Sequence, residues 1–103
     1  NKIDKMPEYP GGIPALSAFL SKNIKYPKSA MEAGIYGCVY ISFVVEKNGK
    51  ISDVQVAKSV HSSLDEEAAR VVKMMPKWTP RIQNGKPVRV RFTLPVNFKL
   101  NNR

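Results

Sequence analysis

Residues 87–100 read PVRVRFTLPVNFKL. Apolar side chains occupy every even position from Val88 to Leu100, whereas the odd positions are mostly charged or polar. This strict period of two predicts a β-strand with one buried face and one solvated face. Pro95 lies on the solvated side of the pattern. Because proline has no N–H to donate to a ladder, we expect a sheet edge, a strand start or a bulge there.

A second segment of period two begins at Gly37. Its alternate positions are apolar: Val39, Ile41, Phe43 and Val45. Asn48-Gly49 follows, and these residue types readily adopt the positive φ angles of a tight hairpin turn, so residues 51–59 are predicted to return as a second strand. Ile51 is out of phase with Val54 and Val56, which predicts a bulge or a late strand start.

Helical periodicity predicts three helices. Residues 13–23 carry one apolar stripe, and a very short helix opens at Tyr26-Pro27 and ends at Gly34. The main helix covers residues 64–75, opened by a capping box of Ser63 and Glu66 and ended by Pro76. Residues 77–87 are predicted to be a loop containing two prolines and a second Asn-Gly.

These elements make an α+β domain: a three-stranded antiparallel sheet with helices packed on one face. A right-handed crossover that skips one position places the last strand beside the first. The strand order is therefore 2-1-3, and the second and last strands are edges. We assign residues 1–8 to a lead-in segment and residues 9–103 to one domain, with no internal repeat.

The composition describes a small basic protein. In 103 residues, 17 Lys and Arg face 8 Asp and Glu, for a formal charge of +9. Such a surface attracts nucleic acid, anionic lipid, cell-wall polymer or an acidic protein. One cysteine and one histidine exclude an intramolecular disulfide and a Cys/His zinc cluster. We expect no metal and no cofactor, and no run reaches the roughly 18 apolar residues of a membrane helix.

Residues that could serve catalysis have structural interpretations. Asp65, Glu66 and Glu67 occupy the first turn of the predicted main helix, where carboxylates stabilise the positive end of its dipole. His61 has no obvious partner and is expected to be solvated. Trp78 and Phe43 are predicted core residues, and Cys38 a half-buried one. With no phosphate loop, nucleophile elbow or two-histidine motif, we expect the domain not to be an enzyme.

The edge of the last strand is the candidate binding site. If the backbone groups of Pro95 point away from the first strand, the even residues form the hydrogen bonds to that strand, and the backbone N–H and C=O groups of the odd residues are free to bind another strand. Besides Pro95, the odd residues are Arg89, Arg91, Thr93, Asn97 and Lys99. Two other interpretations stay open. Charges and proline could simply protect the edge against aggregation. Alternatively, a face with Tyr36, Tyr40 and arginines could stack nucleic-acid bases.

Four segments share the order and spacing of a known family: YPGGIPAL (9–16), YPKSAMEAGIYGCVYISFVVEKNG (26–49), LDEEAARVVKMMPKW (64–78) and NGKPVRVRFTLPVNFKL (84–100). Together they resemble the carboxyl-terminal domain of TonB-type energy transducers, in the variant with a PGG amino-terminal helix. The resemblance runs from about Tyr9 to Leu100.

The resemblance implies a periplasmic domain of an inner-membrane-anchored protein with a proline-rich linker. We expect the chain, which begins with Asn rather than Met, to be a fragment or a processed product. The implied task is to capture the TonB box of TonB-dependent outer-membrane transporters as a strand added to the last strand. Inner-membrane proton-channel partner proteins would supply proton-motive force for uptake, and the domain itself would perform no chemistry.

Tyr26 and Pro27 match the Tyr-Pro motif of that family, and Lys28 matches a basic residue that often follows it. Arg81 stands where related sequences frequently have glycine. The alternatives are the same domain as a docking module on a membrane sensor or peptidase, and a basic nucleic-acid-binding module. The preferred interpretation has no nucleic-acid partner. Exposed edges would also permit an intertwined homodimer.

Overall fold

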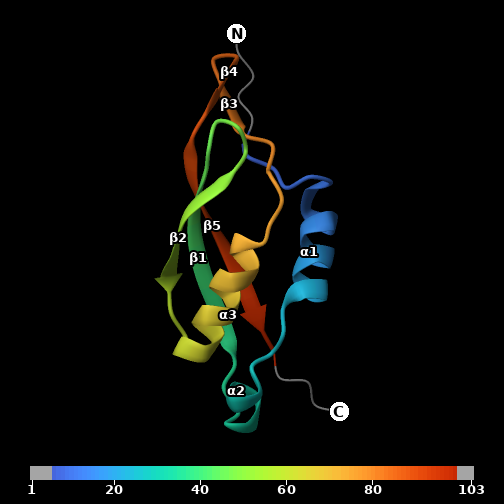
Figure 1. Ribbon diagram of the computed structural model, residues 1–103, viewed down its shortest axis with the longest axis vertical. Helices are drawn as coiled ribbons and strands as arrows, with labels where there is room; N and C mark the ends of the chain where they lie inside the picture. The colour runs from blue at the N-terminus through green and yellow to red at the C-terminus, as the bar shows by residue number, and fades with distance from the viewer. Residues whose placement is uncertain (1–5, 100–103) are drawn as a thin grey trace.

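The computed structural model describes residues 6–99, and its helices and strands are shown in Figure 1. The main sheet contains β1 (Gly37–Val45), β2 (Ile51–Lys58) and β5 (Val90–Phe98). Its order is β2-β1-β5 and both pairings are antiparallel. The helices are α1 (Gly12–Asn23), α2 (Lys28–Glu32) and α3 (Ser62–Lys73). The predicted α+β class, the strand order and the helix-covered sheet are confirmed.

The core lies between the sheet and α3, on the side of the sheet where α1 also runs (Figure 1). β1 is the central strand, and its alternate residues are fully buried: Val39, Ile41, Phe43 and Val45. They meet buried residues of α3 and β5, among them Leu64, Ala68, Val72, Leu94, Val96 and Phe98. Each large apolar side chain buried in this way contributes about 1.5–3 kcal/mol. The predicted core positions of Phe43 and Trp78 are confirmed.

β2 is irregular, as the phase of Ile51 predicted. Its pairing with β1 shifts register between Ser42 and Val44, where Asp53 adopts a positive φ of 48°. An extra residue on one strand is the signature of a bulge. The strand nevertheless begins at Ile51 itself. The bulge is therefore the correct one of the two predicted explanations.

The two Asn-Gly pairs form different turns. At the first, the Gly49 N–H donates to the Glu46 carbonyl at 2.8 Å, and only Gly49 has a positive φ while Asn48 does not. The prediction that both residues would adopt positive φ is therefore wrong at this turn. At the second, Asn84 and Gly85 both have positive φ, 54° and 78°. This is the pattern of a two-residue hairpin turn.

The second turn joins two strands that the sequence did not predict. β3 (Arg81–Gln83) and β4 (Lys86–Val88) form an antiparallel hairpin over the expected loop and Val88, so the last strand begins at Val90 rather than at Val88. Strands of three residues are too short to show a period of two, and Pro87 argues against a strand unless its position needs no donor. The prediction of an irregular loop over residues 77–87 is therefore wrong for its second half.

α3 begins earlier than the sequence predicted. Its N-cap is His61, whose ring Nδ1 accepts the Ser63 N–H at 3.2 Å. The predicted capping box at Ser63 is therefore wrong. His61 is exposed, as predicted, but the expectation that it lacks a partner is wrong. Asp65 supports the same turn because its carboxylate accepts the Val60 N–H at 3.1 Å and the Ser59 hydroxyl. Histidine is an uncommon cap, which explains why the sequence pattern pointed to serine.

α2 follows the sequence more closely. Pro27 is its N-cap rather than its first helical residue, and Gly34 has a positive φ of 72° after the helix ends. Among residues 6–99, no helix has the length and apolar character needed to cross a membrane.

Replacing Gly49 by alanine is expected to lower the free energy of unfolding by about 2–4 kcal/mol. Gly49 has a φ of 88°, and a Cβ there would lie 2.1 Å from the Trp78 carbonyl oxygen. The same glycine accepts the Trp78 N–H at 2.9 Å, so the two segments cannot separate without losing a hydrogen bond. Urea denaturation measures the effect.

Gly85→Ala is the matched control. Gly85 also has a positive φ, but a Cβ there meets nothing within 4 Å. We expect a loss of only about 1–2 kcal/mol from backbone strain. Equal losses in the two variants would show that the close approach of Gly49 to Trp78 is unimportant.

Candidate strand-docking site

β5 is an edge strand whose two rows of side chains differ as the sequence predicted. It pairs with β1 from Gly37 opposite Phe98 to Val45 opposite Val90. Its odd residues from Arg91 to Asn97 are exposed, whereas its even residues are buried or half-buried. No second strand pairs with β5 among the residues that the structure describes. One backbone edge of β5 is therefore open over its length.

Arg89 and Arg91 are engaged within the chain. The guanidinium of Arg89 lies 2.8 Å from Glu46 Oε1, and that of Arg91 pairs with Asp53 and contacts Ser42. The Arg89 hydrogen bond is the main cause that lowers the pKa of Glu46. Hydrogen bonds from Gln55 and then Arg91 lower the pKa of Asp53. The arginines thus lie along the solvated sheet face with their own carboxylates.

Tyr26 and Pro27 lie at the far end of β5. The Tyr26 ring packs edge-on against Phe98, with centroids 5.6 Å apart, and its hydroxyl donates to the Ile35 carbonyl. Burial raises the pKa of this phenol. Lys28 is the exposed first residue of α2. The Tyr-Pro motif therefore supports the end of the edge strand.

The candidate residues are spread along β5 and just beyond both of its ends. Asn97 and Lys99 flank Phe98, the residue that packs against Tyr26. Arg89 lies ten residues before Lys99, or about 33 Å along an extended strand. Thr93 is near the middle. The candidate site is thus a long edge rather than a compact pocket.

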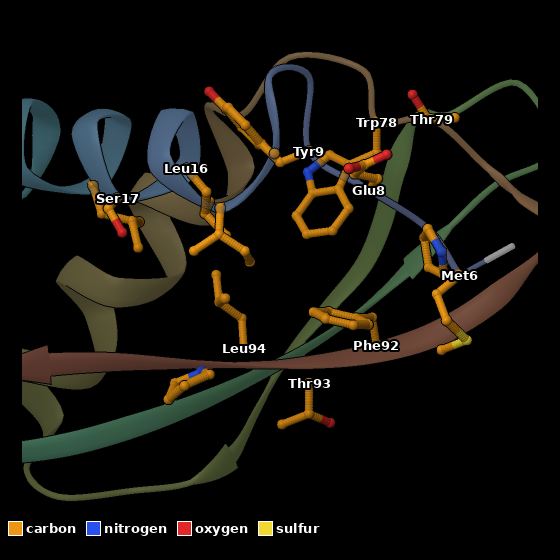
Figure 2. Close-up of a pocket in the computed structure, with 15 residues that line it drawn as sticks. Met6, Glu8, Tyr9, Leu16, Ser17, Trp78, Thr79, Phe92, Thr93 and Leu94 are labelled. Atoms are coloured by element: carbon orange, nitrogen blue, oxygen red, sulfur yellow. The ribbon is translucent and has the colours of Figure 1, made fainter.

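A groove between α1 and β5 has no counterpart in the sequence analysis. Its volume is about 820 Å³, and its walls come from the segment before α1, from α1, from Trp78 and Thr79, and from β5. In Figure 2, Leu16 and Leu94 point toward one another across it, whereas Thr93 points to the opposite face of β5. The sequence marks both elements as amphipathic. It does not show that they leave a space between them.

The segment before α1 closes one end of this groove. Glu8 and Thr79 form a β-bridge with two backbone hydrogen bonds of 3.0 and 2.8 Å. Beside it, Tyr9 and Trp78 pack edge to face with ring centroids 5.9 Å apart. Trp78 also contacts Phe92 at 5.4 Å. An aromatic cluster therefore fixes the segment onto the sheet.

Asp65 and Glu67, two acidic residues of α3, have structural partners. Glu67 accepts the backbone N–H of Lys25 at 2.7 Å and forms an ion pair with Arg70 at 2.6 Å. The hydrogen bond from Arg70 is the largest of the causes that lower the pKa of Glu67. Arg70 also donates to the Asn23 carbonyl. Across residues 6–99, no group of three or more His, Cys, Asp or Glu side chains is placed to hold a metal ion. Cys38 is half-buried, as predicted.

The fold and the open edge together define a small α+β domain suited to binding an extended segment. Residues 22–100 match the family described as the carboxyl terminus of the Gram-negative bacterial TonB protein. The chain belongs to this family.

Similar proteins carry the same name. Protein TonB of Pseudomonas aeruginosa is 36% identical over 80 residues, which cover 76% of this chain and 23% of that protein. Protein TonB of Xanthomonas campestris is 36% identical over 84 residues, 79% of this chain and 38% of that protein. The chain therefore spans well under half the length of these relatives.

The fold also has a solved counterpart. The solution structure of the Helicobacter pylori TonB carboxyl-terminal domain, residues 194–285, aligns with a TM-score of 0.64. The alignment covers 87% of this chain and 95% of that one, at 24% sequence identity. This likeness concerns the fold alone.

Replacing Arg89 by methionine is expected to raise the pKa of Glu46 toward its ordinary range, because the variant keeps the apolar stem but removes the guanidinium. A carboxylate whose pKa is lowered in the folded state stabilises the fold above its unfolded-state pKa, and this contribution disappears as the pH falls through the folded-state pKa. The stability difference between the two proteins should therefore be largest near neutral pH and vanish in acid. NMR titration of the side-chain carboxyls measures the pKa.

Lys99→Met removes one positive charge from the other end of the strand and should leave the Glu46 titration unchanged. An unchanged Glu46 titration in Arg89→Met would contradict the assigned role of Arg89.

Proposed function

We propose that this domain is the transporter-docking module of a TonB-type energy transducer. It captures the TonB box of an outer-membrane transporter as an extended segment that adds a strand to β5. The observation that carries the proposal is the open edge of β5 in a chain of the TonB family. Strand addition to an exposed sheet edge is a recurring mode of peptide recognition.

The position of Pro95 supports the choice of edge. Pro95 lies opposite Tyr40 in the register with β1. In an antiparallel pair, opposed residues alternate between hydrogen-bonded and non-hydrogen-bonded pairs. If the pair at Pro95 is non-hydrogen-bonded, its missing N–H costs no bond to β1. The backbone groups of Arg91, Thr93 and Asn97 then point outward, toward an incoming strand.

The energetics favour a reversible encounter. An added strand could form roughly five backbone hydrogen bonds at about 1 kcal/mol net each. The loss of rigid-body freedom on association offsets much of this gain, so the expected affinity is around micromolar. In this proposal, Lys28, Asn97 and Lys99 contact the flanks of the captured segment. Reversible capture suits a coupling module that must release its partner.

The wider role follows from the family. The domain would act in the periplasm as part of an inner-membrane-anchored protein, whose proton-channel partners supply the energy for transport. Its task would be binding rather than catalysis. The same edge would serve a docking module on a membrane sensor or peptidase, and the sequence upstream of Asn1 distinguishes these two cases.

Nucleic-acid binding receives less support. Arg89 and Arg91 pair with Glu46 and Asp53 on the solvated sheet face, which lowers the positive charge available to phosphates. Tyr40 on that face is half-buried beside the Lys58 amine, which lies 5.8 Å from its ring centroid. Tyr36 is 64% exposed, but the covered Tyr40 ring leaves these two tyrosines without a pair of open rings for stacking.

Thr93→Pro is expected to abolish capture of a synthetic TonB-box peptide while leaving the domain folded. If the backbone groups of Thr93 point outward, as proposed, the variant removes one outward N–H from the middle of β5 but no hydrogen bond to β1. Isothermal titration calorimetry measures the binding, and circular dichroism checks the fold. Hydrogen exchange of the unmodified domain should show that the peptide protects amides between residues 89 and 99.

Thr93→Val keeps the N–H and should bind as the unmodified domain does. Unfolding of the Thr93→Pro variant would mean that the N–H of residue 93 donates to β1, and that the proposed outward direction of this N–H is wrong. Unchanged peptide binding by Thr93→Pro would mean that the β5 edge is not the docking site.

A further inference from the structure

We infer that the groove between α1 and β5 receives two alternate apolar side chains of the captured strand and thereby selects which segments the domain binds. This inference rests on the proposed strand addition to β5. It assigns a second recognition element to the domain, beside the backbone edge. The occupant is a peptide strand with apolar residues at every second position over the length of the groove.

The groove is continuous with the edge of β5. Phe92 and Leu94 line it with side chains on the helix-covered side of the sheet. Thr93 and Pro95 also line it, although the Thr93 side chain points to the other face in Figure 2. The groove therefore reaches around the strand to its outer edge. A strand added there would have one row of side chains directed into the groove.

Strand geometry sets how many side chains the groove accepts. An added strand lies about 4.8 Å from β5, and its side chains on one face repeat about every 6.7 Å. The wall from α1 runs alongside β5 (Figure 2), and it extends from Gly12 to Leu20. At 1.5 Å per residue this wall is about 12 Å long. It therefore covers two successive inward side chains, and a third would lie beyond it.

The lining selects apolar side chains. Leu16 and Leu94 face each other across the groove and are each 6% exposed, and the half-buried Leu20 and Phe92 extend the same surface. Ile13 stands at the rim with 72% of its surface exposed, so its side chain is available to cover an incoming residue. The lining also includes Glu8, Ser17 and Thr79, so a charged or amide side chain would lose water here and gain a partner only where it reaches one of these three.

The opposite face of the added strand meets a different surface. On that face of the sheet, Arg91 of β5 and Arg89 just before the strand already pair with Asp53 and Glu46. Peptide side chains on this face remain in solvent beside arginines whose charges are already paired, and such a surface discriminates little among polar residues. Sequence selection therefore falls on the groove-facing row.

Two synthetic peptides of the same composition test this inference. In one, four valines alternate with four threonines; in the other, they form blocks of two, Val-Val-Thr-Thr-Val-Val-Thr-Thr, so that no two successive side chains on one face of the strand are both valine. Both carry two aspartates at each end, which favours solubility and matches the +9 charge of the domain. Burying one branched apolar side chain corresponds to roughly tenfold or more in affinity. We expect the alternating peptide to bind about tenfold or more tightly than the blocked one.

Ser17→Trp is the decisive variant. Ser17 is exposed on α1 and lines the groove, so an indole there fills space without disturbing the core. We expect about tenfold weaker binding of the alternating peptide and no preference between the two peptides. Ser21→Trp makes the same change one turn further along α1, at an exposed residue outside the groove lining, and should bind as the unmodified domain does.

The outcomes separate the two proposals. If Thr93→Pro abolishes binding but Ser17→Trp and the order of valines have no effect, strand capture stands and the groove inference is overturned. Strand capture at β5 fails if the unmodified domain binds neither peptide, or if the Thr93→Pro variant binds the alternating peptide as tightly as the unmodified domain does. In either case the groove inference fails with it. Dimerisation that protects the groove without peptide, seen by ultracentrifugation and hydrogen exchange, would make a second copy the occupant.

Discussion

The antiparallel pairing of β5 with β1 is the constraint on which the other features depend. Its register sets Val39 opposite Val96, Ile41 opposite Leu94 and Phe43 opposite Phe92. These residues form the sheet side of the core beneath α3. A shift by one residue would turn every apolar side chain of β5 into solvent. The same register also positions Pro95 and the open outer row, so the core and the binding edge are two results of one pairing.

A second group of contacts is centred on Trp78. The Trp78 N–H donates to the carbonyl of Gly49 in the β1–β2 turn, and the Trp78 ring packs against Tyr9, Phe43 and Phe92. Segments distant in sequence therefore meet at one aromatic residue. This arrangement fixes the segment that leads into α1 and, with it, the distance of α1 from β5. The groove is a consequence of that spacing.

Part of the positive charge that the composition makes available to a partner is paired within the chain. A formal charge of +9 favours acidic partners, and the sequence makes the arginines of β5 the natural contacts. In the structure those arginines pair with Glu46 and Asp53, which hold them along the sheet face. Charge can still speed association over a distance. Selection among extended segments then depends on backbone groups and the apolar groove.

The sequence by itself determined the elements with a long, regular period: the β1–β2 hairpin, the main helix, and the alternating last strand whose crossover places it at an edge. It missed the three-residue strands β3 and β4 and the His61 cap, because short or uncommon local signals are weak. Only the tertiary structure decided that Arg91 pairs with Asp53 and that Leu16 and Leu94 face one another across a groove. Periodicity specifies which face of an element is apolar. The separation between two such faces depends on packing between residues far apart in the chain.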